Sequence, residues 1–294
     1  MVGPRPFYWV VMADTHVIDD TYEGPEGSPL DTETILRANE RFAAVRDQIN
    51  DLGLPVAFSA IVGDVIHDYA SRDYDYYFVQ ENRPAIDIAV ETINGFDMPV
   101  YIGLGNHDYD VPHFSREDTH RLFKEKMGIE PYYFWDHQGW RFVHLNSQLG
   151  PTWDEQSDQY NRGLGSLGRT QLAWLDEVLQ DGLPSFVFVH HHAFSFLAKE
   201  DREGPFEGLD DVLERHSDTV RLTISGHLHR WVDLGDKLVI GATRFDEDAF
   251  FVVRCDPSGR FEILNREAAH WLGSHPDGSR GGIEPWALPD NLPR

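Results

Sequence analysis

The sequence predicts an α/β fold in which strands and helices alternate. In the first third of the chain, apolar stretches of strand length alternate with stretches of helical periodicity. Each predicted strand runs into polar or ionisable residues. This alternation is typical of βαβ layers, in which the carboxyl ends of the strands gather at one edge of the sheet. We therefore expect the functional residues at that edge.

The composition fits one globular domain followed by a short tail. Of the 294 residues, 41% are hydrophobic, which is ample for a core at a length that one domain can reach. We predict a domain over residues 1–270 and a surface tail over residues 271–294, where glycine, proline and polar residues predominate. The lone Cys255 excludes an internal disulfide framework and a cysteine-rich metal site.

Hydropathy and charge restrict location and partners. No apolar stretch reaches the length of a membrane span, and the N-terminus lacks a basic segment followed by an apolar run. We therefore expect a cytoplasmic protein without a membrane partner. The 50 acidic residues outnumber the 25 basic ones, and such a surface repels polyanions. A nucleic-acid polymer is not expected as a partner.

The amino-terminal half supplies three predicted strands, and the carboxyl-terminal half adds more. Buried strands are predicted at residues 7–13, 56–62 and 99–104, with helices at 32–49 and 74–94 between them. There follow a helix at 113–127, paired strands at 132–135 and 140–146, a helix at 169–179, and strands at 185–189 and 220–225. Short apolar segments at 238–240, 250–253 and 261–264 suggest a second sheet.

Five of the predicted strand ends carry side chains that are able to bind a metal ion. Side chains repeat every two residues along a strand, so the two members of each alternating pair should point the same way. Carboxylate, amide and imidazole donors without thiolates suit Mn, Fe or Zn. The candidates are Asp14 with His16, Asp64, Asn106 with His107, the run His190-His191-His192, and His227 with His229.

Each of these motifs, taken alone, has an ordinary structural explanation. Asp14-Thr15-His16 is compatible with a turn closed by a local hydrogen bond, and Gly105-Asn106 with a type I′ turn. Of the three consecutive histidines, we expect one to bind a metal and the others to pack or hydrogen-bond around it. Their joint occurrence at successive strand ends makes the ordinary explanation improbable. A carboxylate such as Asp64 can bridge two cations, and cations about 3.5–4 Å apart form a clamp for displacement at phosphorus.

The ordered motif set resembles the calcineurin-like metallophosphoesterase superfamily. Within it, the chain is most similar to the compact branch that includes class III cyclic-nucleotide and glycerophosphodiester phosphodiesterases. The resemblance implies a four-layer αββα sandwich with a dinuclear metal site at the carboxyl edges of the strands. The motifs that carry it are Asp14-x-His16, Gly63-Asp64-x-x-His67-Asp68, Gly105-Asn106-His107-Asp108, His190-His191 and Gly226-His227-x-His229.

The resemblance also implies a role for each motif residue. His107 would contact the phosphate and protonate the leaving oxygen, and Asp108 would orient His107. His191 is the alternative to His190 as a ligand, and His67 is interpreted as a solvated residue at a helix start in preference to a pocket residue. The resemblance implies two divalent or trivalent ions of Mn, Fe or Zn. The first ion would be held by Asp14, His16, Asp64 and His229, and the second by Asp64, Asn106, His190 and His227.

The implied function is hydrolysis of a small phosphodiester by a hydroxide that bridges the two metal ions. The alternatives are a phosphomonoesterase or a nucleoside-diphosphate-linked pyrophosphatase and, less favoured, a non-catalytic metal-binding scaffold, because no ligand of the motif set is missing. Substrate contacts and oligomeric state are not assigned. Aromatic residues of the loops are compatible with stacking on a nucleobase or with ordinary packing, among them Tyr109, Phe114, Trp153 and Tyr160.

Overall fold

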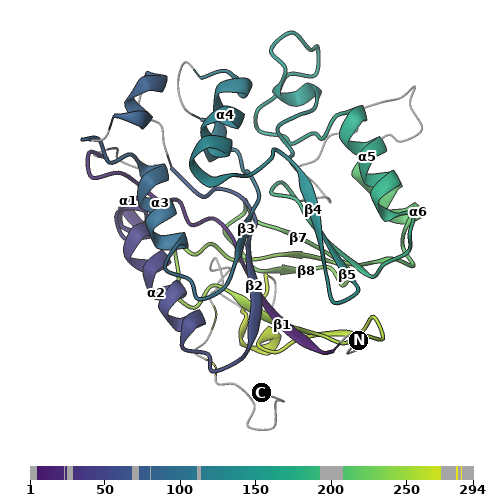
Figure 1. The fold of residues 1–294 in the computed structure, drawn as a ribbon. Coiled ribbons are helices and arrows are strands. Elements are labelled where there is room, and N and C mark those ends of the chain that lie inside the picture. The colour runs from purple at the N-terminus through teal and green to yellow at the C-terminus, as the bar shows by residue number, and fades with distance from the viewer. Residues whose placement is uncertain are drawn as a thin grey trace.

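Two mixed β-sheets packed face to face form the centre of the molecule (Figure 1). The computed structural model describes residues 5–22, 24, 29–67, 73–79, 81–110, 114–192, 208–272, 283 and 286. The first sheet has the order β11-β10-β1-β2-β3 and the second β4-β5-β6-β7-β9-β8. The strands are β1 Phe7–Met12, β2 Val56–Ile61, β3 Val100–Ile102, β4 Tyr133–His137, β5 Trp140–His144, β6 Ser185–Phe188, β7 Val220–Ser225, β8 Val232–Asp233, β9 Lys237–Val239, β10 Phe251–Cys255 and β11 Phe261–Ile263.

The first strand shows how the sequence builds the layers. All six residues of β1 are apolar and buried. Phe7, Trp9 and Val11 belong to the core between the two sheets, whereas Val10 and Met12 pack with the helices outside the first sheet. Alternate side chains of a strand point to opposite faces, so a strand covered on both faces needs a continuous apolar run.

Helices cover the outer face of each sheet (Figure 1). Phe42 and Val45 of α2 pack beneath the first sheet together with Ile86 of α3, and Leu172 and Leu175 of α5 pack against the second. The order helix, sheet, sheet, helix confirms the four-layer αββα sandwich. The helices are α1 Pro29–Leu36, α2 Ala38–Asn50, α3 Ala85–Ile93, α4 Arg116–Met127, α5 Arg169–Leu179 and α6 Leu209–Arg215, with 3-10 turns η1 Tyr74–Phe78, η2 His107–Tyr109, η3 Pro151–Trp153 and η4 Arg266–Ala268.

Two predicted helices are divided in the structure. Residues 32–49, predicted as one helix, belong to α1 and α2, which are interrupted at Arg37. The prediction for residues 74–94 is wrong in its first half, because η1 stands there and α3 begins only at Ala85. Pro84 has extended backbone just before α3, and proline suits the start of a helix but not its interior. None of the helices in the described part of the chain is long and apolar enough to cross a membrane.

The short apolar segments near the C-terminus do not form a sheet of their own. β10 pairs with β1 in the first sheet, and β9 pairs with β7 in the second. The second sheet begins instead with the hairpin β4–β5. This part of the sequence therefore completes both sheets, a pairing that strand length and apolar content could not specify.

Candidate metal centre

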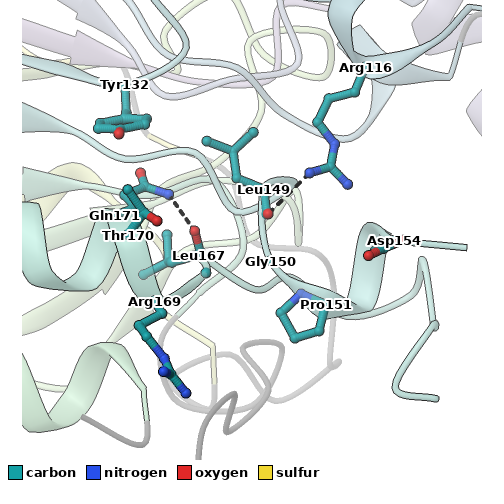
Figure 2. Close-up of a pocket in the computed structure, with 11 residues that line it drawn as sticks. Arg116, Tyr132, Leu149, Gly150, Pro151, Asp154, Leu167, Arg169, Thr170 and Gln171 are labelled. Atoms are coloured by element: carbon teal, nitrogen blue, oxygen red, sulfur yellow. Dashed lines mark hydrogen bonds between the residues drawn. The ribbon is translucent and has the colours of Figure 1, made fainter. Parts of the chain in front are cut away.

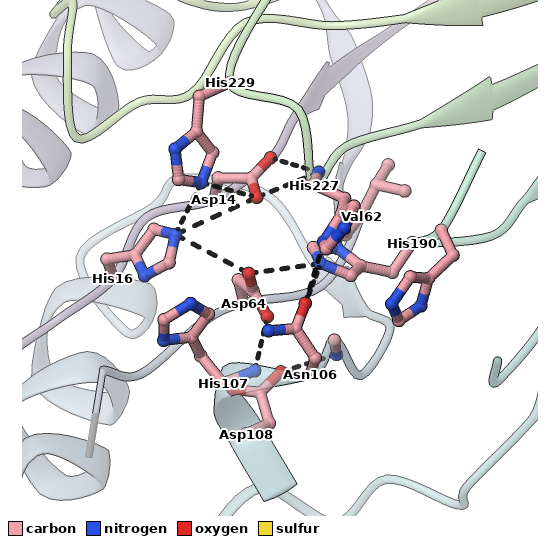
Figure 3. Close-up of polar contacts among 12 residues, drawn as sticks. Asp14, His16, Val62, Asp64, Asn106, His107, Asp108, His190, His227 and His229 are labelled. Atoms are coloured by element: carbon pink, nitrogen blue, oxygen red, sulfur yellow. Dashed lines mark hydrogen bonds and ion pairs between the residues drawn. The ribbon is translucent and has the colours of Figure 1, made fainter. Parts of the chain in front are cut away.

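All predicted ligands meet where strands of both sheets end (Figure 3). The five loops that supply them follow β1, β2, β3, β6 and β7, and backbone hydrogen bonds tie neighbouring loops together. The amide of Asp14 donates to the carbonyl of Gly63, and the amide of Gly226 donates to the carbonyl of His190. Asp14, His16, Asp64 and His190 are buried, whereas Asn106, His107, His227 and His229 are partly exposed. The buried residues form the floor of the site, and the partly exposed residues form its solvent-facing side.

The backbone of this site is strained. Among the described residues, six that are not glycine have positive φ, and five of them are predicted ligands. Left-handed backbone costs about 1–2 kcal/mol for such a residue, and strain of this kind is common at functional sites. The sequence predicts that the members of each alternating pair point the same way because they continue a strand. The left-handed backbone shows that these residues lie in loops beyond the strand ends, so the loops and not the alternation of a strand set the direction of the side chains. The five residues are Asp14 (φ 56°), His16 (48°), Asp64 (50°), His227 (72°) and His229 (53°).

One group of donors surrounds Asp14. The Nε2 atoms of His16 and His229 lie 3.0 Å apart. The Nε2 atom of His229 is 3.3 Å from Oδ1 of Asp14, and that of His16 is 3.6 Å from Oδ2 of Asp64. These four residues could hold one metal ion, because each offers one donor atom and all four atoms lie within 4.8 Å of one another.

A second group of donors surrounds Asn106. Its Oδ1 atom is 2.9 Å from Nδ1 of His227 and 3.1 Å from Nε2 of His190. The same Nε2 atom is 3.1 Å from Oδ2 of Asp64. Asp64, His190 and His227 could hold a second ion, and the amide oxygen of Asn106 adds a fourth donor.

Asp64 connects the two groups. Its Oδ2 atom faces Nε2 of both His16 and His190, at 3.6 and 3.1 Å. Its Oδ1 atom accepts a hydrogen bond of 2.8 Å from the amide of His107, which fixes the carboxylate. One carboxylate oxygen thus lies between the two donor groups, the position that a bridging ligand requires.

The hydrogen-bond partners of His190 indicate that the donor set suits cations. Nδ1 of His190 lies 3.0 Å from the carbonyl oxygen of Val62, so it carries a proton and donates. The Nε2 lone pair of neutral His190 then faces two oxygen atoms, those of Asp64 and Asn106, which is unfavourable unless a positive charge lies among them. Burial lowers the pKa of His190, but the Asp64 carboxylate outweighs burial and raises that pKa to about 9. Either a proton on Nε2 or a metal ion between these atoms would remove the repulsion between the lone pair and the two oxygen atoms.

The three consecutive histidines separate in the structure. His190 faces Asp64 and Asn106, whereas Nδ1 of His191 lies 2.8 Å from Oγ of Ser147. The ring of His191 packs on that of His227, with centroids 4.3 Å apart. The geometry therefore favours His190 over His191 as the ligand, and it places His191 behind His227. His192 is buried as well.

Asp108 differs from its prediction. Its Oδ1 atom accepts hydrogen bonds of 3.0 Å from the amides of Val65 and Ile66, and its Oδ2 atom accepts one of 2.7 Å from the amide of Gly105. The hydrogen bonds of its side chain thus run to the main chain of two loops and not to the ring of His107. Burial and the nearby Asp64 carboxylate raise the pKa of Asp108 to about 8. Its role is to connect the loops after β2 and β3.

His67 also departs from its prediction, because it is buried and not solvated. Only 1% of it is exposed. Its Nδ1 atom lies 2.9 Å from Nδ1 of His16, and its ring stacks on His107 with centroids 4.5 Å apart. The only feature of the sequence that points to a place for His67 in the site is its position three residues after Asp64. Asp68, the other residue of that motif, lies outside the described residues.

Two cavities lie beyond His191. The larger, of about 1150 Å³, is lined by Tyr109, Phe114, Trp153 and Tyr160 together with charged residues. Trp153, which lines this cavity, is in edge contact with His191 at 6.4 Å between ring centroids, and the ring of His191 in turn packs on that of His227. A cavity of about 460 Å³ adjoins it, and there Arg116 donates to the carbonyl of Leu149 at 3.1 Å (Figure 2).

Comparisons with known proteins agree with this geometry. A model of the family described as calcineurin-like phosphoesterase matches residues 9–231. A dimetal phosphatase from Danio rerio has 18% identity and a TM-score of 0.59, over 85% of this chain and 92% of that one. The calcineurin-like phosphoesterase YfkN from Bacillus subtilis has 13% identity and a TM-score of 0.50, over 88% of each chain.

A protein of a different kind shares the fold. GAP50, described as the anchor in the inner membrane complex of Plasmodium, has 13% identity and a TM-score of 0.50, over 86% of this chain and 82% of its own. None of the curated proteins compared with the chain matches it significantly in sequence. At such low identities the solved structures show the fold alone, whereas the family model covers most of the chain. This chain belongs to the calcineurin-like phosphoesterase family.

Proposed function

We propose that this protein hydrolyses a small phosphodiester with the help of two metal ions. Members of its family are hydrolases of phosphoester bonds. The observation that carries the proposal is the set of two donor groups that share Oδ2 of Asp64. The site has strained backbone and is partly exposed to solvent. An enzyme needs such a site, because a substrate must reach it, whereas a non-catalytic scaffold does not.

The donor groups define which residues would hold the ions. When bound, two adjacent cations neutralise phosphate oxygens and lower the pKa of a coordinated water. Oxygen and imidazole donors fit Mn, Fe or Zn. We assign Asp14, His16, Asp64 and His229 to the first ion, and Asp64, Asn106, His190 and His227 to the second.

His107 is the residue that we assign to the substrate. Its amide is fixed by Asp64 and its ring stands edge-on to His16, with centroids 4.5 Å apart. Burial lowers the pKa of His107 well below its usual value. An anionic phosphate beside the ring favours the charged form, so a proton would be taken up with the substrate. That proton is then available to the leaving oxygen.

The larger cavity supports a diester over a substrate with a second phosphate. Four carboxylates line it, those of Asp110, Glu117, Asp154 and Glu155, against two arginines. Both arginines have protein partners: Arg162 pairs with Asp110, and Arg116 donates to the carbonyls of Leu149 and Trp153. Such a cavity suits an uncharged or cationic organic group and repels a further anion. Over the whole chain, acidic residues also outnumber basic ones, which supports a small substrate over a nucleic-acid polymer.

A panel of substrates tests the proposal. Protein reconstituted with Mn²⁺ is assayed with bis-p-nitrophenyl phosphate, p-nitrophenyl phosphate, cyclic AMP and ADP-ribose. We expect the highest kcat/KM on a diester, and we expect Asp64→Asn to remove most of that activity. An asparagine side chain has no negative charge and only one oxygen, which cannot both face the two donor groups and accept from the amide of His107. Asp218→Asn, the same change at an exposed position, is the control and should be unaffected.

The other outcomes separate the alternatives. Preference for the monoester would identify a phosphomonoesterase, and hydrolysis of ADP-ribose alone would identify a pyrophosphatase; either would overturn the diester assignment. Protein that binds two ions and hydrolyses no member of the panel would support a metal-binding scaffold.

A further inference from the structure

His67 lies directly behind His16 and is fixed there. The amide of His67 donates to the carbonyl of Val17 at 2.8 Å, and the amide of His16 donates to the carbonyl of Asp64 at 2.9 Å. These bonds hold the two loops side by side. The two Nδ1 atoms then lie 2.9 Å apart, in a buried environment.

The proton between these two atoms follows from the other side of the His16 ring. Nε2 of His16 faces Asp64 and Nε2 of His229, so a metal ion bound there takes its lone pair. The single proton of neutral His16 must then be on Nδ1, which makes Nδ1 a donor. Nδ1 of His67 is consequently the acceptor, and the proton of neutral His67 is on its Nε2 atom.

Neighbouring rings keep His67 in this orientation. The ring of His107 stacks on one face at 4.5 Å with an interplanar angle of 22°. Tyr22 meets the ring edge-on at 5.5 Å and 75°. These contacts fix the plane of the His67 ring. A half-turn about the Cβ–Cγ bond would keep that plane but replace Nδ1 with a carbon atom, so the contact with Nδ1 of His16 decides which edge of the ring faces His16.

We propose that His67 is a positioning residue for the first metal ion: its Nδ1 atom accepts the Nδ1 proton of His16 and so holds the Nε2 lone pair of His16 toward Asp14 and Asp64. This inference rests on the proposed metal centre. The usual partner of a metal-binding histidine is a carboxylate or a backbone carbonyl, and a neutral imidazole here adds no charge to a site that already holds two carboxylates.

A direct role as a ligand is the competing explanation. Donor nitrogens of His16, His67 and His107 lie within 4.8 Å of one another and could themselves hold an ion. That ion would need Nδ1 of His16, on the far side of the ring from Asp14 and Asp64. It would be a third ion per chain, so metal stoichiometry distinguishes the two explanations.

Two substitutions separate the acceptor atom from the packing of the ring. His67→Phe keeps an aromatic ring on His107 but removes the acceptor. His67→Asn loses the ring, yet its Oδ1 atom can occupy the place of Nδ1 and accept the same proton. His216→Phe, at a histidine paired with Asp176 far from the site, is the control.

The measurement is Mn²⁺ binding by titration calorimetry, with total bound metal determined on the same samples and folding checked by circular dichroism. We expect two ions per chain in the wild type, and in His67→Phe an affinity about 10–100-fold weaker for one of them. His67→Asn should recover most of the affinity, and His216→Phe should match the wild type. No activity is required, so the result does not depend on whether the diester assignment is right.

Three outcomes would overturn the proposal. In the first, His67→Phe binds both ions with wild-type affinity. In the second, His67→Asn binds as weakly as His67→Phe, which would show that packing and not the acceptor atom matters. In the third, the wild type binds a third ion that His67→Phe loses, which would make His67 a ligand.

Discussion

Single hydrogen bonds determine which nitrogen of each buried imidazole is available at the metal centre. The carbonyl of Val62 takes the Nδ1 proton of His190, and Nδ1 of His67 faces Nδ1 of His16. In both cases Nε2 is left facing the carboxylate of Asp64. A histidine whose other nitrogen is occupied by the protein is oriented before the metal arrives, which reduces the entropy lost on binding.

Alanine substitutions at His190 and His191 test which of these two histidines binds the second metal ion. His190→Ala should lower kcat/KM by more than about 100-fold, because it removes a donor to the second ion and not only an outer partner, whose loss costs about 10–100-fold. His191→Ala should lower it by about 10-fold or less, because Nδ1 of His191 bonds Ser147. Steady-state kinetics with bis-p-nitrophenyl phosphate measure both. A larger loss in His191→Ala than in His190→Ala would move the ligand by one residue.

At the scale of the elements, the loops after β2 and β3 must approach each other closely. Asp108 binds the amides of Val65, Ile66 and Gly105, and the amide of His107 binds Asp64. A Cβ atom on Gly105 would overlap the carboxylate of Asp64 and would lie 2.5 Å from its amide nitrogen. Glycine is therefore required at position 105 for the loops to meet, and not for turn formation alone.

Gly105→Ala should consequently separate the two loops and displace Asp64. We expect loss of nearly all hydrolytic activity and a lower melting temperature, since overpacking costs about 1–3 kcal/mol. Activity and thermal unfolding of the purified variant measure these effects. Gly163→Ala is the control, because its added Cβ would meet only Oδ1 of Asn161 at 3.3 Å. Wild-type activity in Gly105→Ala would show that the loops can adjust.

The sequence predicted elements and ligands better than it predicted the contacts between loops. Apolar runs revealed the buried strands, and the polar residues that end them are those that the structure gathers. The burial of His67 and the bonds of Asp108 could not be predicted, because they depend on how separate loops pack against each other. The break before α3 was predictable, because Pro84 marks it.

At the scale of the whole molecule, charge opposes the arrival of the proposed substrate. The chain has a formal net charge of −25 at pH 7. The proposed metal ions supply local positive charge, but at low salt an anion must first cross a repulsive field. The field shortens as the Debye length falls from about 30 Å at 0.01 M to about 8 Å at 0.15 M ionic strength.

Added salt should therefore increase kcat/KM for an anionic diester. We expect a rise between about 0.01 M and 0.15 M ionic strength, with kcat nearly constant because the bound complex is unchanged. Initial rates with bis-p-nitrophenyl phosphate in KCl at fixed Mn²⁺ give both parameters. A decrease of kcat/KM with salt would mean that positive charge at the entrance dominates the approach.

The left-handed backbone of the site affects how the protein would respond to selection for thermostability. Asp14, His16, Asp64, His227 and His229 all have positive φ, which glycine adopts without penalty and asparagine tolerates. Replacing any of them with glycine would relieve about 1–2 kcal/mol of local strain, but it would also remove the contacts of that side chain, such as the hydrogen bonds that Asp14 and Asp64 accept from the amides of His227 and His107. Selection for heat resistance alone would thus keep these side chains only as far as their own contacts and bound metal ions stabilise the fold. Thermostable descendants of this protein would have to be screened for activity in every round, since here stability and function compete for the same five positions.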